Sequence, residues 1–70
     1  MKIDQSLEGK RVRIRNVDGN IFEGIVEDYI YPEDNEPEGV AGLDISDCPQ
    51  MPEKWIGFNE NEIEDIEILD

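Results

Sequence analysis

Two adjacent strand-like segments, joined by a short turn, constrain this chain more than any other feature. Residues 10–16 read Lys-Arg-Val-Arg-Ile-Arg-Asn, with polar and apolar side chains alternating, and residues 21–31 form a longer second segment. A period of two is typical of a strand that buries one face. The Asp18-Gly19 dipeptide between the segments is a common hairpin turn. The sequence therefore predicts a β-hairpin.

The register of this hairpin follows if Ile14 and Phe22 face each other on the core side. The loop is then residues 17–19, with glycine in the left-handed position of a bulge. In the same register Val12 lies opposite Gly24. A glycine at that point predicts a sharp bend in the second strand, and we expect Gly24→Val to crowd the core and destabilise the fold.

Three further strands are predicted after the hairpin, over residues 40–46, 54–58 and 63–69. Their core faces are predicted to carry, in turn, Leu43 with Ile45, Ile56 with Phe58, and Ile66 with Ile68. The stretches between them, residues 32–39 and 47–53, contain two prolines each and predict loops.

Two helical turns complete the predicted architecture. Residues 3–8 predict a brief turn whose Leu7 covers an open end, and residues 59–62 predict a second turn that Asn59 can cap. Seventy residues allow one domain with one core. We therefore predict an all-β domain over residues 1–70, a closed, strongly bent antiparallel barrel of five strands.

Charge and cysteine content limit the partners. The chain has 6 basic and 19 acidic residues and a net charge of −13, which should repel phosphate backbones and anionic membranes. Nucleic acid is therefore a disfavoured partner. No apolar run approaches the roughly 18 residues of a membrane span, and residues 1–4 lead into no signal-peptide core. A single cysteine predicts a reduced, cytoplasmic protein in which Cys48 is an ordinary loop residue.

Four of the six basic residues fall in one short stretch, at Lys10, Arg11, Arg13 and Arg15. The three arginines are the candidate contacts for nucleic-acid phosphates. The alternative is that they form the solvent face of a strand, with Arg13 paired to Glu23 across the hairpin. The excess of acids favours this alternative.

Aromatic side chains are the candidate binding residues, namely Tyr29, Tyr31 and Trp55. The two tyrosines share a strand face, and Trp55 is opposite in parity to the predicted core residues of its own strand. Exposed aromatic rings supply rigid apolar area at interfaces. The alternative is that they cover the ends of the barrel beneath the long loops.

Catalysis and metal binding have little support in the sequence. The chain contains no histidine, and no nucleophile with a base partner or phosphate-binding glycine loop is present. Residues 34–39 begin like a calcium-binding loop, but Ile45 stands where a bidentate glutamate belongs. We expect a noncatalytic protein with no cofactor and no metal, and an acidic loop exposed to solvent.

Residues 7–29 also combine apolar positions, a basic residue, an Asp-Gly turn and a bending glycine in a recognisable order. The residues concerned are Leu7, Gly9, Lys10, Val12, Ile14, Asp18, Gly19, Phe22, Gly24, Val26 and Tyr29. This stretch, about a third of the chain, resembles the first motif of the Sm and Sm-like proteins. The whole chain resembles short, acidic, uncharacterised bacterial Sm-like proteins. The resemblance implies a barrel of the Sm-like or Src-homology-3-like kind.

The resemblance does not extend to the residues with which the family contacts RNA. Ile30 stands where the family usually has aspartate, and residues 33–34 are Glu-Asp where a Met-Asn pair is usual. The second motif, an apolar residue followed by Arg-Gly, has its nearest equivalent in residues 55–58, which contain no arginine. The turn at residues 59–62 is similar to that of Src-homology-3-like and Tudor-like barrels.

These observations predict a noncatalytic binding module that acts through protein contacts, using the aromatic residues or its strand edges. The alternatives are an RNA-binding Sm-like protein and an acidic decoy that mimics nucleic acid and occupies a basic partner. Sm-like barrels resemble units that close into rings by edge pairing, so a homo-oligomer through strand edges is also expected. The acids of residues 60–67 disfavour a large ring.

Overall fold

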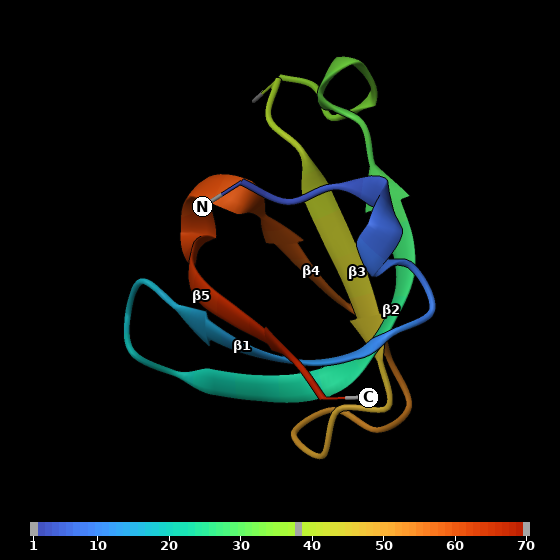
Figure 1. Cartoon of the computed structure of the whole chain (residues 1–70), viewed down its shortest axis with the longest axis vertical. Helices are drawn as coiled ribbons and strands as arrows, with labels where there is room; N and C mark the ends of the chain where they lie inside the picture. The colour runs from blue at the N-terminus through green and yellow to red at the C-terminus, as the bar shows by residue number, and fades with distance from the viewer. Residues whose placement is uncertain (1, 38, 70) are drawn as a thin grey trace.

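The computed structural model describes residues 2–37 and 39–69, which form one antiparallel sheet of five strands and three short 3₁₀ turns (Figure 1). In chain order the elements are η1 (Gln5–Leu7), β1 (Arg11–Asn16), β2 (Ile21–Ile30), η2 (Pro32–Asp34), β3 (Gly42–Ser46), β4 (Ile56–Asn59), η3 (Glu60–Glu62) and β5 (Ile63–Ile68). The all-β prediction and both predicted helical turns are confirmed. The turn η2, within the first predicted loop, was not expected.

The predicted hairpin register is confirmed. Ile14 lies opposite Phe22, and Val12 lies opposite Gly24. The loop is residues 17–19, and Gly19 has a φ of 85° while its N–H donates to the Asn16 carbonyl at 2.9 Å. Glycine adopts this left-handed conformation without a steric penalty, so the sequence and the turn agree.

The sheet order is β4-β3-β2-β1-β5, and the sheet is not closed. The prediction of a closed barrel is therefore wrong. Closure would require β4 to pair with β5. The strand β4 has only four residues, and η3 redirects the chain between the two strands. Each of them consequently has a neighbouring strand on one side only.

The strand β2 is strongly curved (Figure 1), and the neighbour that requires glycine at position 24 is on β3. A Cβ atom at Gly24 would lie 2.3 Å from the carbonyl oxygen of Ser46 and 3.1 Å from the Cys48 sulfur. The register between β2 and β3 shifts between Val26 and Asp28, as in a β-bulge. The sequence predicted that Gly24 lies opposite Val12, which is correct, but the tightest contact of a Cβ added at Gly24 is with the backbone of β3.

The core fills the concave side of the sheet. Its buried members are Ile3, Leu7, Val12, Ile14, Val26, Ala41, Leu43, Ile45, Cys48, Phe58 and Ile63. Phe22 packs edge-to-face on Phe58, with ring centroids 5.2 Å apart. Cys48 lies in the predicted loop, but its side chain is fully buried, which corrects its assignment as an ordinary loop residue. Burial raises the pKa of its thiol, and the negative charge of Asp47 raises it further.

One core prediction for the last strand is wrong. Ile66 packs against the core as expected, but Ile68 is 48% exposed, and Ile63 is buried instead. The register between β1 and β5 shifts between Arg15 and Asn16, so that Asn16 lies opposite Ile63. This irregularity turns Ile63 inward, although its odd position in the chain predicts the solvent face.

Strand boundaries differ by one or two residues from the prediction at all five strands. Among the described residues, no helix is long and apolar enough to cross a membrane.

Candidate functional site

The two tyrosines pack together at one end of the sheet. Their rings meet edge-to-face with centroids 4.9 Å apart. Tyr29 is half-buried against the core, and its backbone N–H donates to the Glu8 carboxylate at 3.0 Å. The Tyr31 hydroxyl donates to Gln5 Oε1 at 2.9 Å. Burial raises the pKa of the Tyr29 hydroxyl, and the charge of Glu60 raises it further. These two hydrogen bonds hold the N-terminal turn η1 and Glu8 at the end of β2, beside which η1 lies in Figure 1.

Trp55 lies at the opposite end of the sheet and is 58% exposed. It directly precedes β4, whose first residue Ile56 pairs with Ile45 near the end of β3. Tyr29, in contrast, pairs with Leu43 near the start of β3. The structure therefore brings the tyrosines together but does not join Trp55 to them in one surface.

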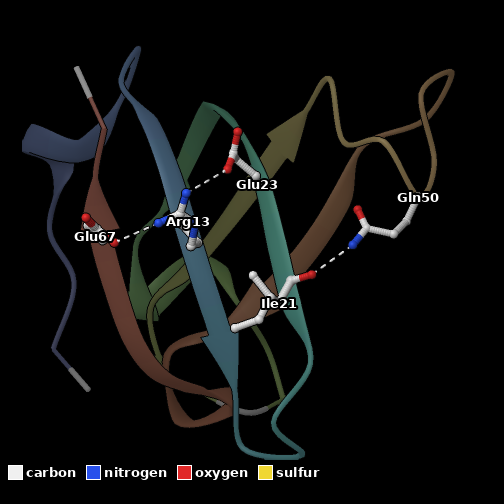
Figure 2. A network of polar contacts seen from close by, with 5 residues as sticks. All are labelled: Arg13, Ile21, Glu23, Gln50 and Glu67. Carbon is white, nitrogen blue, oxygen red and sulfur yellow. Dashed lines mark hydrogen bonds and ion pairs between the residues drawn. The ribbon is translucent and has the colours of Figure 1, made fainter.

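Each arginine of the basic strip has an acidic partner. Arg13, on β1 between β2 and β5, is 3.3 Å from Glu23 on β2 and 3.1 Å from Glu67 on β5 (Figure 2). The predicted pair with Glu23 is confirmed. These groups are partly exposed, so each pair contributes at most about 1 kcal/mol.

The other two arginines are paired in the same way. Arg11 lies 2.9 Å from Asp47, and Arg15 lies 3.1 Å from Glu64. The strip is therefore a surface in which positive and negative charges alternate. That arrangement weakens its attraction for phosphate at long range.

Besides the end of β2, which extends beyond β1 and where the Tyr29 N–H donates to the Glu8 carboxylate, three segments of the sheet have no neighbouring strand on one side, and the first is the outer edge of β4. The N–H of Glu60 donates to the Ala41 carbonyl at 2.8 Å. Hydrogen-bonded pairs alternate along an antiparallel ladder, so Gly57 and Asn59 direct their backbone groups away from β3. The N–H of Asn59 already donates to the Glu62 carboxylate at 2.7 Å. The β4 edge is thus short and partly capped by a side chain.

The second is the start of β2, which β3 does not reach: pairing with β3 begins at Ile25. The Gln50 amide from the loop after β3 donates to the Ile21 carbonyl oxygen at 2.8 Å (Figure 2). One acceptor of this edge, the Ile21 carbonyl, is therefore occupied by a side chain.

The third is the outer edge of β5. The N–H of Leu69 donates to the Arg11 carbonyl at 2.8 Å. By the same alternation Glu67 bonds to β1, while Ile66 and Ile68 direct their N–H and C=O groups to the open side. Glu62 contacts the Asn59 N–H, and Gln50 contacts the Ile21 carbonyl. Among residues 2–37 and 39–69, no side chain makes such a hydrogen bond to the backbone groups of Ile66 or Ile68.

The acidic loop is held by an amide. Asn35 Nδ2 donates to the Val40 carbonyl and to Asn59 Oδ1, both at 2.8 Å, which ties the loop to the start of η3. A shallow depression in the loop is lined by its own prolines and glutamates. The part of the chain that the structure describes contains no group of three His, Cys, Asp or Glu side chains that could hold a metal ion. Glu38, part of the calcium-loop pattern, lies outside the described residues.

Comparison of the chain with protein-family models, with curated proteins and with solved structures finds no match. The fold and edges described above define a small all-β sheet protein. The Sm-like resemblance rests on the first-motif residues of the sequence.

The sequence predicted strand edges as a binding surface and drew attention to the acids of residues 60–67, but it did not identify which edge is open. The alternation of residues 63–69 predicts a strand but does not say whether another strand pairs with its far side. One signal was present: acidic side chains are common on exposed edges, and β5 has three, at Glu64, Asp65 and Glu67.

Proposed function

We propose that this protein is a noncatalytic, protein-binding module of the Sm-like or Src-homology-3-like kind. The observation that carries the proposal is the outer edge of β5. Its unpaired backbone groups are the element by which an exposed sheet edge takes up a partner strand. The tyrosine pair serves the fold by holding η1, although Tyr31 is itself 42% exposed, and Trp55 is the most exposed aromatic residue of the candidate set at 58%.

The finer fold assignment has support from several elements. The N-terminal turn η1, the curved strand β2 and the turn η3 before the last strand occur together, and a barrel of this kind has a comparable turn before its last strand. The Asp-Gly turn and the bending Gly24 occupy the positions that they hold in the first Sm motif. These features are shared by small bent β-folds, so the proposal is supported by their combination.

The proposal also addresses self-association. A ring of identical copies joined by edge pairing needs two receptive edges on each copy. Here the β4 edge is short, and Glu62 occupies the N–H of Asn59. We therefore infer that the protein is a monomer or a small assembly, and light scattering of the purified chain tests this. A particle of five or more copies would contradict it.

The function is tested by co-purification of tagged variants from the native host. Ile68→Pro removes an N–H that faces the open side and leaves the ladder to β1 intact, which proline on an edge strand permits. We expect a defined protein to accompany the wild type and Trp55→Ala but not Ile68→Pro, with all three variants folded by circular dichroism. Loss with Trp55→Ala alone would move the site to the tryptophan. Equal retention by all three variants would contradict the role of the edge.

An RNA-binding function is the second candidate, because Arg11, Arg13 and Arg15 lie on one exposed face of β1. Phosphate contacts are strongest at low salt. Filter binding of single-stranded RNA at low salt tests this candidate, and no retention there would remove it. The ion pairs of all three arginines favour that outcome. The acidic decoy is the third candidate, and it requires a basic partner whose binding weakens steeply with salt.

A further inference from the structure

We propose that the partner of the β5 edge is an extended segment in which basic and apolar residues alternate, added to the sheet as a sixth strand. This inference rests on the proposed function and specifies the chemistry of the partner at that same site.

The backbone argument decides where the segment binds. On each of the other open edge segments a side chain occupies one backbone group: Gln50 the Ile21 carbonyl at the start of β2, Glu8 the Tyr29 N–H at its end, and Glu62 the Asn59 N–H on β4. The N–H and C=O groups of Ile66 and Ile68 face the open side of β5. They offer alternating donors and acceptors over a span that a partner strand can match.

The side chains of β5 decide the chemistry. Asp65 and Glu67 lie on the solvent face, paired with Arg15 and Arg13 of the adjacent strand β1. Ile66 packs against the core on the other face, and Ile68 follows it with 48% of its surface exposed. An added strand continues the alternation, so residues beside the acids are best basic and residues beside the isoleucines are best apolar.

The same reasoning disfavours a second copy of this chain as the occupant. Antiparallel pairing of two β5 strands centred on Ile66 places Asp65 opposite the second copy's Glu67, and the reverse. Like charges directly opposite one another destabilise a strand pair. A basic segment instead places opposite charges there, and the net charge of −13 attracts it at long range.

The test uses three synthetic peptides of equal length, in which valine alternates with lysine, with serine or with glutamate. Binding to the full chain is measured by fluorescence anisotropy at low and moderate salt. Two favourable cross-strand pairs, to Asp65 and Glu67, predict that the lysine peptide binds roughly tenfold more tightly than the serine peptide. The difference should shrink as salt rises, and the glutamate peptide should bind most weakly.

Hydrogen exchange locates the bound peptide. The amides of Ile66 and Ile68 should become protected when the lysine peptide binds. The amide of Glu67, already bonded to β1, should change little. Protection elsewhere, without protection of these two amides, would overturn the proposal.

Two matched variants test the charge argument without altering the backbone. Asp65→Asn should weaken binding of the lysine peptide about threefold and leave the serine peptide unaffected. Asp34→Asn removes the same charge from exposed η2, away from the edge, and should leave both peptides unaffected. Equal losses from both variants would mean that net charge alone drives binding, which would overturn the site.

The outcomes separate this inference from the proposed function. If the serine peptide binds as tightly as the lysine peptide and protects Ile66 and Ile68, the edge is a docking site but the basic partner is wrong. If no peptide binds and co-purification still depends on position 68, the proposed function stands and this inference falls. If no peptide protects the Ile68 amide and co-purification does not depend on position 68, both fall.

Discussion

Gly24→Ala is the substitution whose effect can be worked out most directly from the structure. The added Cβ would lie 2.3 Å from the Ser46 carbonyl oxygen, a backbone atom of the adjacent strand β3. Ordinary contact would require that oxygen to retreat by about 1 Å, since carbon and oxygen atoms attract only beyond about 3.4 Å. The Cys48 sulfur at 3.1 Å blocks relief on the other side.

Overpacking of a close-packed core by one methyl group costs roughly 1–3 kcal/mol, and contact with backbone places this site at about 3 kcal/mol. A domain of this size has a total stability of about 4–10 kcal/mol. Its melting temperature falls by about 4–8 °C for each kcal/mol lost, so we expect a drop of roughly 12–24 °C. Gly24→Val adds two further methyl groups and should leave the chain unfolded.

Thermal unfolding followed by circular dichroism measures this effect, with Gly57→Ala as the matched control. Gly57 is an exposed strand glycine whose Cβ would meet only the end of the Asp44 side chain, at 3.0 Å. That side chain can move, so the control should melt within a few degrees of the wild type. If Gly24→Ala melts as high as Gly57→Ala, the close approach of β2 and β3 at the bend is incorrect.

Three further predictions concern groups away from the bend. Asp44 lies directly opposite Asp28, and partial burial together with the charge of Asp28 raises its pKa. Because the folded state then disfavours the ionised form, Asp44→Asn should stabilise the protein by about 0.5–1 kcal/mol at neutral pH in urea titrations. The gain should vanish as pH falls below the ordinary pKa of aspartate, where both folded and unfolded states hold the proton; a constant gain would refute the charge argument. The buried Cys48 thiol should react with a thiol reagent only as fast as the fold opens, and immediate labelling without denaturant would contradict its burial. Tyr31→Phe loses the bond to Gln5 and should cost about 0.5–1 kcal/mol at this partly exposed position; no change in urea midpoint would show that the bond does not stabilise η1.

The local features of the fold were predictable because their causes lie in neighbouring residues. The hairpin register followed from alternation around an Asp-Gly turn, and the cap of η3 followed from Asn59. The exchange of Ile68 for Ile63 in the core was not predictable. The burial of Ile63 depends on an irregularity in the pairing of β5 with β1, which involves residues almost fifty positions apart, and Ile68 lies at the exposed end of the same strand.

The candidate site divides in the same way. The arginine face and the Arg13–Glu23 pair were predicted from strand parity, which is a local property. The separation of Trp55 from the tyrosines was not, since it depends on which end of β3 each aromatic residue meets. Whether the sheet closes likewise depends on the relative reach of β4 and β5, which no single segment of the sequence encodes.

The carboxylate of Glu62, seated on the Asn59 amide, has a consequence for how such a molecule joins others. A subunit with two open strand edges can pair with a copy at each edge and so polymerise, as amyloid does. Because Glu62 occupies part of the β4 edge, the addition of a partner strand to β5 does not lead to the addition of a further copy at the other edge. The chain is rich in isoleucine and valine, and such chains aggregate readily through exposed strand edges. The Glu62 contact limits this aggregation and leaves the β5 edge available for a partner.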